Sequence, residues 1–355
     1  MNTNQNPAQF GTSSSVDRLS STQVPELAVL GAGSWGTALA LLLCRNGWRV
    51  RLWDHAPELI SALRWAGENR RYLPGYPLPP TLSLVTELAA VVEGADGLLV
   101  VVPSHAFASV LRRLSGFLPD TLGIAWATKG FDPATGHLLH RVAEDMLGPR
   151  DLAVVSGPNF AHEVATGLPA AVTVASHSPQ YARRVASYLH SDRFRVYIGD
   201  DLVGVQVGGA AKNVLAIAAG IADGLGFGAN TRAALITRGL VELMRLGTGL
   251  GGRRETFMGL AGLGDLVLTC TDDQSRNRRL GLALARGLSV EEAKRKIGQE
   301  MEGLVTSRVV TAIAHRLGME MPICDQVFRV LYEGLKPEEA TRNLLIRDGK
   351  VESID

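Results

Sequence analysis

The feature that most constrains the fold of this chain is a glycine-rich turn close to the N-terminus. The apolar run Leu27–Leu30 predicts a buried β-strand, and the sequence GAGSWG at positions 31–36 follows it directly. From Thr37 to Arg45 the chain is rich in Ala and Leu, which favours a helix. A strand, a tight turn and a helix in this order predict the first unit of a parallel sheet whose strands are joined by helices.

The glycines of this turn have the spacing Gly31-x-Gly33-x-x-Gly36, which is typical of a dinucleotide-binding site. The first glycine allows the tight turn, the second lets the backbone approach a pyrophosphate, and the third lets the helix pack on the strand. Asp54 follows the next predicted strand, where an acid can accept hydrogen bonds from the ribose of NAD. His55 comes next and would, when protonated, favour the 2′-phosphate of NADP, so NAD(H) and NADP(H) stay as alternatives.

Up to about residue 200, short aliphatic runs alternate with longer helical patterns. This alternation predicts an α/β domain with a doubly wound, Rossmann-type parallel sheet. Prolines between Pro74 and Pro80 indicate a loop before a weaker strand near Leu82. The other predicted strands are Leu27–Leu30, Arg49–Trp53, Leu98–Val102, Leu122–Ala127, Leu152–Val155, Ala171–Ala175 and Arg195–Ile198.

After that point the strand-like runs disappear, and Ala, Leu and Gly at helical spacing continue to about Leu345. The change predicts a second, all-helical domain, and 355 residues are enough for two domains. The expected parts are a disordered tail at 1–24, a dinucleotide-binding domain at 25–200, a helical substrate and catalytic domain at 201–345 and a C-terminal tail at 346–355.

Charge and cysteine content argue against several classes of partner. The chain has 36 Lys and Arg residues against 35 Asp and Glu, and this balance gives no reason to expect a nucleic acid partner. Cys44, Cys270 and Cys324 are far apart and form no CxxC pattern, which favours reduced thiols and a cytoplasmic protein. No stretch reaches about 18 uninterrupted apolar residues and the N-terminal residues contain no apolar signal, so we expect no stable membrane insertion.

Two lysines and a polar turn are candidate ligand contacts. Lys129 follows one predicted strand, Gly157 and Asn159 follow another, and ligands collect beyond the carboxyl ends of such strands. Lys212 lies in a helix that is otherwise small and apolar, where burial should lower the pKa of its ammonium group unless an acid compensates. A lysine of this kind can serve as a general acid or base, or hold an oxyanion.

Further polar residues occur in the predicted helical domain. Asp265 follows a Gly-Leu-Gly sequence, and Ser, Arg and Asn side by side at 275–277 form a donor cluster suited to a phosphate dianion. His105 and His162 follow predicted strands, but neither has a neighbouring carboxylate in a clear dyad, so we expect structural or peripheral roles for them. We find no spacing of ligating residues that predicts a metal site.

Together these stretches closely resemble the bacterial NAD(P)-dependent glycerol-3-phosphate dehydrogenases. The resemblance rests on GAGSWGTALA, ATKGFD, SGPNFAHEV, AAKNVLAIAAGIADGLGFGANTRAALITRG, GLAGLGDLVLTCTDDQSRNRRLG and EGLVTS, in the order of the family, from about Leu27 to Leu345. It implies reversible reduction of dihydroxyacetone phosphate to sn-glycerol 3-phosphate by NAD(P)H, which supplies the glycerophospholipid backbone. It also implies a phosphorylated triose as the small-molecule partner and a homodimer.

The resemblance implies roles for single residues as well, with Lys212 as the catalytic acid or base that protonates the C2 alkoxide during reduction. The positions expected to contact substrate are Lys129, Gly157, Asn159, Lys212, Asp265, Ser275, Arg276 and Asn277. Those expected to contact the cofactor are Gly31, Gly33, Ser34, Trp35, Gly36, His55, Tyr72, Lys129, Ala161, Arg276, Glu300 and Glu302. Glu300 departs from the aliphatic residue that the family pattern leads us to expect there.

Two other functions are compatible with a dinucleotide-binding chain of this plan. One is a related NAD(P)-dependent reductase acting on a hydroxy acid or sugar acid, although the cluster at 275–277 suits a phosphomonoester better than a free carboxylate. The other is a redox sensor that binds dinucleotide without catalysis, against which the joint presence of Lys129, Lys212 and Asp265 argues.

Overall fold

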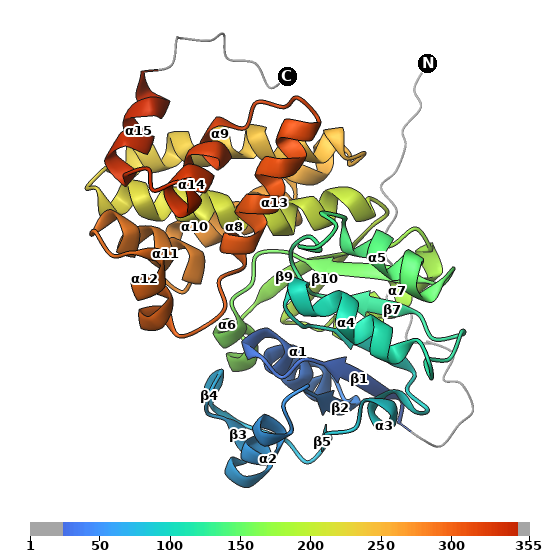
Figure 1. Cartoon of the computed structure of the whole chain (residues 1–355). Helices are drawn as coiled ribbons and strands as arrows, with labels where there is room; N and C mark the ends of the chain where they lie inside the picture. The colour runs from blue at the N-terminus through green and yellow to red at the C-terminus, as the bar shows by residue number, and fades with distance from the viewer. Residues whose placement is uncertain (1–23, 347–355) are drawn as a thin grey trace, which may run out of the picture.

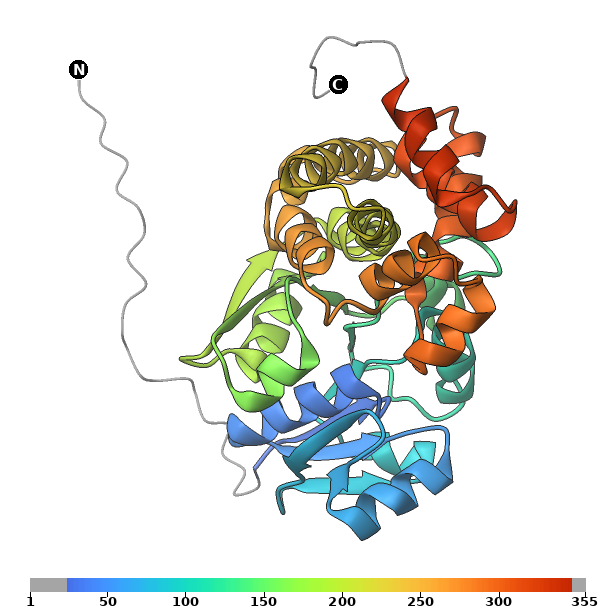
Figure 2. The same ribbon diagram turned by 90° about the vertical axis from the view of Figure 1, so that its left-hand side faces the viewer.

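The computed structural model describes residues 24–346, so the predicted tails at 1–24 and 346–355 lie outside the described residues apart from Val24 and Ile346. A sheet with its covering helices forms one half of the molecule, and the later helices form the other half (Figure 1, Figure 2). The last strand ends at Gly199 and a long helix begins at Leu202. The predicted fold class, a Rossmann-type sheet followed by a helical part, is therefore confirmed.

The main sheet has eight strands in the order β10-β9-β8-β7-β6-β1-β2-β5. They are β1 (Glu26–Leu30), β2 (Arg49–Trp53), β5 (Leu82–Val85), β6 (Gly97–Val100), β7 (Ile124–Trp126), β8 (Leu152–Ser156), β9 (Ala170–Ala175) and β10 (Phe194–Gly199). All strands predicted from the sequence are present, with ends that differ by at most two residues. The strand order reverses at β1 and β6, and in open α/β sheets this reversal places a ligand crevice beyond the carboxyl ends of the strands.

One edge of the sheet is not parallel. The pairs from β5 to β8 are parallel, but β9 pairs with β8 in the antiparallel direction and β10 pairs with β9 in parallel. The connecting helix α6 (Ala161–Thr166) spans six residues. At about 1.5 Å per residue, such a helix is too short to carry the chain back along a whole strand. The expectation of a fully parallel sheet is wrong for β9 and β10.

Helix α1 (Ser34–Arg45) begins inside the glycine turn, three residues before the start predicted from its composition. Its first turn packs so closely on the strand end that a Cβ at Gly36 would collide with the carbonyl oxygen of Gly31. Two buried apolar clusters cover the two faces of the sheet. The other helices of this half are α2 (Pro57–Ala66), α3 (Leu88–Val92), α4 (Ser104–Leu114), α5 (Leu139–Leu147), α6 and α7 (Pro179–Leu189).

The proline-rich segment, predicted as a loop, contains a small hairpin of β3 (Glu68–Asn69) and β4 (Leu73–Pro77). Pro74 and Pro77 fit here because a two-stranded ribbon leaves one side of each strand without ladder partners, where the missing N–H of proline costs little. The loop prediction is therefore wrong for these residues. The hairpin that they form lies next to the glycine turn.

The helical half is built around α8 (Leu202–Gly224), which Asp201 caps by accepting a hydrogen bond from the Gly204 N–H at 2.8 Å. By length and composition α8 could cross a membrane, but 94% of its most apolar window is buried inside the fold, as in the core helix of a globular domain. The other elements are α9 (Ala229–Gly249), η1 (Arg254–Met258), η2 (Leu260–Gly264), α10 (Asp265–Thr271), α11 (Arg276–Ala285), α12 (Val290–Ile297), α13 (Glu302–Arg316), α14 (Pro322–Tyr332) and α15 (Pro337–Leu345).

Glycines set the position of α11 against α8. A Cβ at Gly220 of α8 would collide with the Arg278 carbonyl oxygen, and one at Gly281 of α11 would collide with the Ile217 carbonyl oxygen. The two backbones therefore approach more closely than side chains larger than hydrogen would allow. This close approach fixes the start of α11, with its polar residues at 275–277, beside the middle of α8.

Candidate active site

A cleft lies between the two halves, and residues of both halves line its cavity of about 270 Å³. From the sheet half the lining residues are Ser34, Trp35, Tyr72, Leu73, Ala127, Lys129, Asn159, Phe160, Ala161 and His162. From the helical half they are Lys212, Asn213, Thr269, Gln274, Ser275, Arg276, Asn277, Arg279, Gln299 and Glu302. The glycine turn, both lysines and the cluster at 275–277 thus meet in one place.

The glycine turn presents the first backbone amides of α1 to the cleft. Gly31 has a φ of +112°, and a Cβ there would lie 2.5 Å from the Val101 carbonyl oxygen, so only glycine fits. Gly33 begins the helix without a side-chain cap, and no acid lies in the first turn. Ser34 and Trp35 follow in the lining, and the buried Trp35 Nε1 has no hydrogen-bond partner in the described part of the chain. A helix N-terminus of this kind fits the pyrophosphate of a dinucleotide.

The β3–β4 hairpin is tied to the glycine turn by side-chain hydrogen bonds. Ser34 Oγ donates to the Tyr72 carbonyl oxygen at 2.7 Å, and Asn69 Nδ2 donates to the Ala32 carbonyl oxygen at 2.8 Å. At the other end of the hairpin, Tyr76 Oη lies 2.5 Å from His162 Nδ1. These contacts place Tyr72 in the cleft and hold His162, which also lines the cleft, against the hairpin.

The two lysines share one carboxylate at the bottom of the cleft. Lys129 Nζ donates to Asp265 Oδ2 at 2.6 Å, and Lys212 Nζ donates to Asp265 Oδ1. Asp265 begins α10 and is fully buried, whereas the Lys129 side chain is 15% exposed and the Lys212 side chain 8%. Two ammonium groups on one carboxylate leave a net positive charge, which suits an anionic ligand.

The pKa of the Lys212 ammonium group is lowered to about 8: burial is the largest cause, Asp265 opposes the shift, and the positive charge of Lys129 adds to it. Lys212 Nζ also donates to Thr269 Oγ1 at 2.8 Å, so its direction is fixed by two acceptors. A pKa near the working pH is what a general acid or base needs, because both protonation states are then accessible. The site therefore has the chemistry for proton transfer at Lys212 Nζ.

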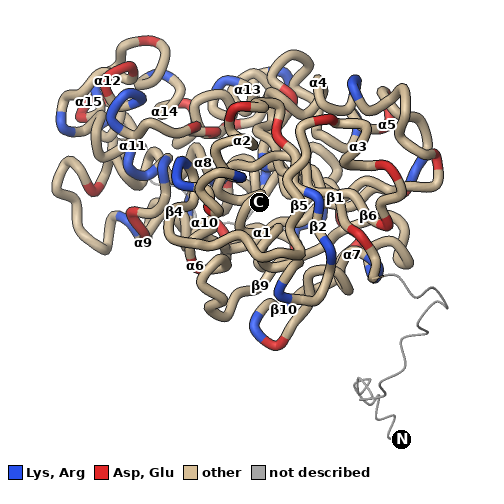
Figure 3. The backbone as a smooth tube through the Cα atoms, turned by 90° about the horizontal axis from the view of Figure 1, so that it is seen from below, with Lys and Arg blue, Asp and Glu red and all other residues tan. Residues whose placement is uncertain are grey.

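The start of α11 supplies the predicted donor cluster, but its members differ in what they do. Ser275 caps the helix by accepting from the Arg278 N–H at 3.2 Å. Asn277 donates to Asn213 Oδ1 at 2.9 Å and accepts from a backbone N–H of α13 at 3.0 Å, so it joins α8, α11 and α13. Arg276 lines the cleft, and within residues 24–346 its guanidinium has no ion-pair partner. Figure 3 shows Lys and Arg residues gathered near α11.

The turn after β8 contributes backbone and amide groups. The Gly157 carbonyl oxygen accepts from Lys129 Nζ at 3.2 Å, and the residue has a φ of +155°, which favours glycine. Asn159 Nδ2 donates to the Ala171 carbonyl oxygen at 2.8 Å, while its buried Oδ1 has no hydrogen-bond partner among residues 24–346. Ala161 lies in the lining at the first position of α6. Asn159 and Ala161 thus border the cleft beside Lys129.

Among the expected cofactor contacts, His55, Glu300 and the three glycines of the turn are not in the cleft lining. The His55 side chain is 78% exposed and its Nδ1 lies 3.0 Å from Asp54 Oδ1. Glu300 is exposed, 3.9 Å from His105 Nδ1. Glu302 does line the cleft, where its Oε2 accepts from the Asn213 side chain at 3.3 Å and burial raises the pKa of its carboxyl group.

The sequence reading missed several residues of the cleft. Thr269 follows Asp265 by one helical turn on α10, and that spacing was the signal that could have revealed its contact with Lys212. Asn213 follows Lys212 on α8, and Arg279 lies one helical turn after Arg276 on α11. Arg279 has no ion-pair partner among the described residues, and its Nε is buried without a hydrogen bond.

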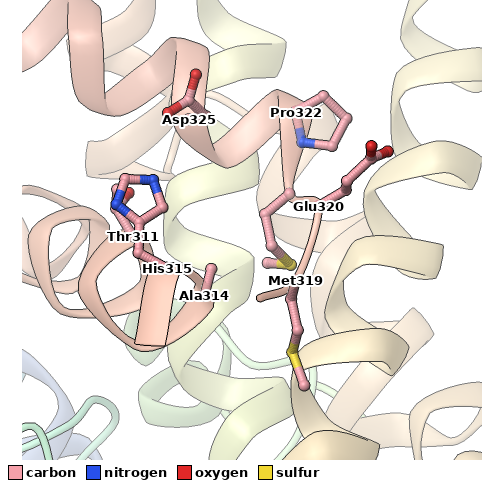
Figure 4. A pocket seen from close by; sticks show the side chains of 8 residues that line it. Thr311, Ala314, His315, Met319, Glu320, Pro322 and Asp325 are labelled. Atoms are coloured by element: carbon pink, nitrogen blue, oxygen red, sulfur yellow. The ribbon is translucent and has the colours of Figure 1, made fainter. Parts of the chain in front are cut away.

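A second cavity of about 220 Å³ lies in the helical half between α13 and α14. Figure 4 shows His315 and Asp325 at its side and Met319 projecting from the connecting loop. It contains none of the residues predicted to contact substrate or cofactor. Over the described residues, no group of three His, Cys, Asp or Glu side chains is arranged to hold a metal ion.

Comparison with known proteins links this arrangement to one family. Residues 26–182 match the model of the N-terminal part of NAD-dependent glycerol-3-phosphate dehydrogenase, and residues 201–342 match the C-terminal part. An NAD(P)-dependent glycerol-3-phosphate dehydrogenase of Thioalkalivibrio sulfidiphilus is 58% identical over 92% of this chain and 99% of its own length. The glycerol-3-phosphate dehydrogenase of Methylococcus capsulatus is 56% identical over 92% of this chain and 98% of its own length. Among solved structures, the crystal structure of glycerol-3-phosphate dehydrogenase from Coxiella burnetii is 50% identical in sequence to this chain. It superposes with a TM-score of 0.89 over 91% of this chain and 99% of the Coxiella chain.

Proposed function

Because this chain belongs to the NAD-dependent glycerol-3-phosphate dehydrogenase family, we propose that it reduces dihydroxyacetone phosphate to sn-glycerol 3-phosphate with NAD(P)H, in a reversible reaction. The observation that carries the proposal is the Lys129–Asp265–Lys212 cluster in the same cleft as Arg276 and the first residues after the glycine turn. A ketone reduction needs a hydride donor, a proton donor and an anchor for the substrate, and this cleft has a candidate for each. The product is the backbone of glycerophospholipids.

In this proposal the dinucleotide supplies the hydride when it is bound across the glycine turn. Lys212 Nζ protonates the C2 oxygen of the substrate as negative charge develops there. Asp265 and Thr269 hold the ammonium group in position by accepting hydrogen bonds from Nζ. In the oxidative direction neutral Lys212 takes the proton from the C2 hydroxyl. The cofactor-contact roles of Ser34, Trp35, Tyr72, Ala161 and Glu302 remain part of the proposal, supported by their place in the lining.

Arg276 is the proposed anchor for the phosphate. It stands in the lining without a carboxylate partner in the described part of the chain, and a guanidinium can bind two phosphate oxygens at once. The net positive charge on Lys129, Asp265 and Lys212 adds to the attraction. Asn277 and Ser275 support the anchor by fixing the first turn of α11.

A decisive test follows oxidation of NADH or NADPH by absorbance after dihydroxyacetone phosphate is added to the purified full chain. We expect turnover with at least one cofactor, and the reverse reaction with sn-glycerol 3-phosphate. A panel with unphosphorylated dihydroxyacetone and several 2-keto acids is the specificity control. Preference for a 2-keto acid would favour the hydroxy-acid reductase alternative. Absence of turnover with every substrate would favour the dinucleotide-binding sensor.

We further propose a homodimer that acts in the cytoplasm, without nucleic acid partners or stable membrane insertion. The edge strand β10 exposes Tyr197 by 59% and Ile198 by 50%, which supports a protein contact at that edge. All three cysteines are free thiols, as expected in a reducing compartment. Light scattering coupled to size exclusion tests the oligomeric state, and cell fractionation tests the location.

A further inference from the structure

We propose that Asp54 makes this cleft selective for NAD(H) over NADP(H), and that His55 does not serve as an anchor for a 2′-phosphate. The inference rests on the proposed function only in requiring that the glycine turn binds a nicotinamide dinucleotide. The two cofactors differ by one phosphate on the adenosine ribose. The question is therefore which charges surround the place where that ribose lies.

Asp54 is held beside the glycine turn by the backbone. It follows the last residue of β2, Trp53, which is the register partner of Leu30 at the end of β1. Its Oδ2 accepts from the Ala32 N–H at 2.8 Å, and the residue is 9% exposed. In sheets of this type the ribose next to the pyrophosphate reaches the carboxyl end of the second strand. The carboxylate is therefore fixed where the 2′-substituent lies.

Hydrogen bonding leaves the carboxylate able to receive a ribose hydroxyl. Besides the Ala32 N–H, the Ala56 N–H donates to Oδ1 at 3.1 Å, and His55 Nδ1 lies 3.0 Å from the same oxygen. A carboxylate has about four acceptor sites, so at least one stays available on Oδ2. A hydroxyl can donate to that site, whereas the phosphate of NADP would meet a fixed like charge.

The segment that follows β2 has no cation suited to a 2′-phosphate. Between Asp54 and Leu63 there is no Lys or Arg, and Glu58 adds a second carboxylate. Arg64 is the first arginine, and its Nη2 donates to the Leu84 carbonyl oxygen at 2.9 Å. A phosphate group carries a charge of about −1.5 to −2 near neutral pH, and NADP sites usually supply an arginine for it.

The remaining nearby cations have other partners. Protonated His55 would do no more than balance the charge of Asp54, with which it is already in contact. On the β3 hairpin, Arg70 Nε donates to Glu68 Oε1 at 2.8 Å. Arg71 lies over a tyrosine ring at 5.1 Å from its centroid. Asp54 and His55 together therefore carry a charge of zero when His55 is protonated and a negative charge when it is neutral, never a positive one.

The experiment measures equilibrium binding of NADH and of NADPH to the full chain, from the fluorescence of the reduced nicotinamide, at fixed ionic strength and without substrate. We expect the wild-type protein to bind NADH at least about tenfold more tightly than NADPH, the effect of one hydrogen bond to a charged group. Asp54→Asn removes the charge but keeps an acceptor oxygen for the Ala32 N–H. In that variant the preference should fall by about tenfold.

The ratio of the two affinities is the readout, because a weaker glycine turn would change both affinities alike. Asp54→Ser serves the same purpose if Asp54→Asn does not fold. His55→Gln is the matched neighbour, and it should change the ratio by less than about twofold. Equal affinities in the wild-type protein, an unchanged ratio in the Asp54 variants, or selective loss of NADPH binding in His55→Gln would each overturn the proposal. Selective NADH binding without turnover of dihydroxyacetone phosphate would contradict the proposed function alone.

Discussion

Two buried carboxyl groups of the helical half have different roles: Asp265 lies beside the cleft, and Glu242 lies between α9 and α14. Asp265 is fully buried at the start of α10 and receives hydrogen bonds from the side chains of Lys129 and Lys212. Glu242 of α9 is 3% exposed and accepts backbone N–H groups at the start of α14, from Ile323 at 2.7 Å and Cys324 at 3.1 Å. Both carboxylates are satisfied, but only one has partners that can change their charge.

The difference lies in the donors. Backbone amides are fixed in position and never titrate at moderate pH, so Glu242 joins α9 to α14 and does little else. The ammonium groups on Asp265 can lose a proton, and burial brings the pKa of Lys212 down to about 8. Burial also raises the pKa of the Glu242 carboxyl group to about 7, so each buried group moves toward its neutral form. A buried charge becomes useful for catalysis when its partner can titrate.

The largest expected effect comes from removing the titrating partner. Lys212→Ala should lower kcat by about 10³-fold, because a positioned general acid contributes about 10²- to 10⁴-fold. Dinucleotide affinity should stay within about twofold, since the proposed contacts to the pyrophosphate lie in the glycine turn and do not include Lys212. Lys212→Arg keeps the charge but cannot give up its proton, so it should be equally slow. Turnover by either variant near the wild-type rate would show that the proton comes from elsewhere.

Neutralising the shared carboxylate should have the next largest effect. In Asp265→Asn the two ammonium groups lose their common counter-charge, and Lys212 loses the acceptor that directs its proton. We expect kcat to fall by about 10²-fold, as for a misplaced catalytic group. The falling limb of the pH profile should move to lower pH, because Asp265 normally opposes the lowering of the Lys212 pKa. An unchanged pH profile would mean that Asp265 has only a structural role, like Glu242.

The pH dependence of the wild-type protein tests the same comparison with a smaller effect. Reduction needs protonated Lys212, so kcat for reduction should be level below its pKa of about 8 and fall above it, by about tenfold per pH unit. Oxidation needs the neutral amine and should rise through the same range. Profiles in both directions at saturating substrate are the measurement. Parallel profiles in the two directions would argue against a single titrating lysine.

Much of this comparison lies beyond what the sequence can predict. The strands and the glycine turn were predictable because their signals are local: a run of apolar residues followed at once by Gly31. Lys129, Lys212 and Asp265 could be picked out singly, but their joint contact spans 136 residues of chain and depends on how α10 packs on α8. Thr269 was missed because a threonine within a helix has no distinctive signal until its partner is known.

The two wrong predictions about the fold have a similar cause. The direction of β9 depends on the length of helix α6 in the connection, and the alternation of strands and helices does not predict how short that helix is. The hairpin at Leu73–Pro77 was hidden by its prolines, which are tolerated only because the ribbon has two strands. Local propensity is decided by each residue and its neighbours, whereas pairing is decided by segments far apart in the chain.

The smallest expected effect on activity comes from the second carboxylate. Glu242→Gln offers one acceptor oxygen to two backbone N–H groups, so at pH 5 it should lower the free energy of unfolding by about 1–3 kcal/mol. The pKa of Glu242 is raised from 4.5 to about 7, so its stabilising contribution is complete below about pH 4.5 and is lost as the pH rises through 7. The difference between variant and wild type should therefore shrink by pH 8.

Urea unfolding at pH 5 and pH 8 checks this prediction, with turnover as the second measurement. Activity should stay within about twofold of wild type, because Glu242 contacts neither the cleft nor its lysines. Glu242→Gln and Asp265→Asn are the same chemical change at two equally buried positions. If both variants lost activity alike, burial of a carboxylate would matter and the titrating partner would not. Loss of activity in Asp265→Asn alone, with loss of stability in Glu242→Gln, would assign the difference to the donors.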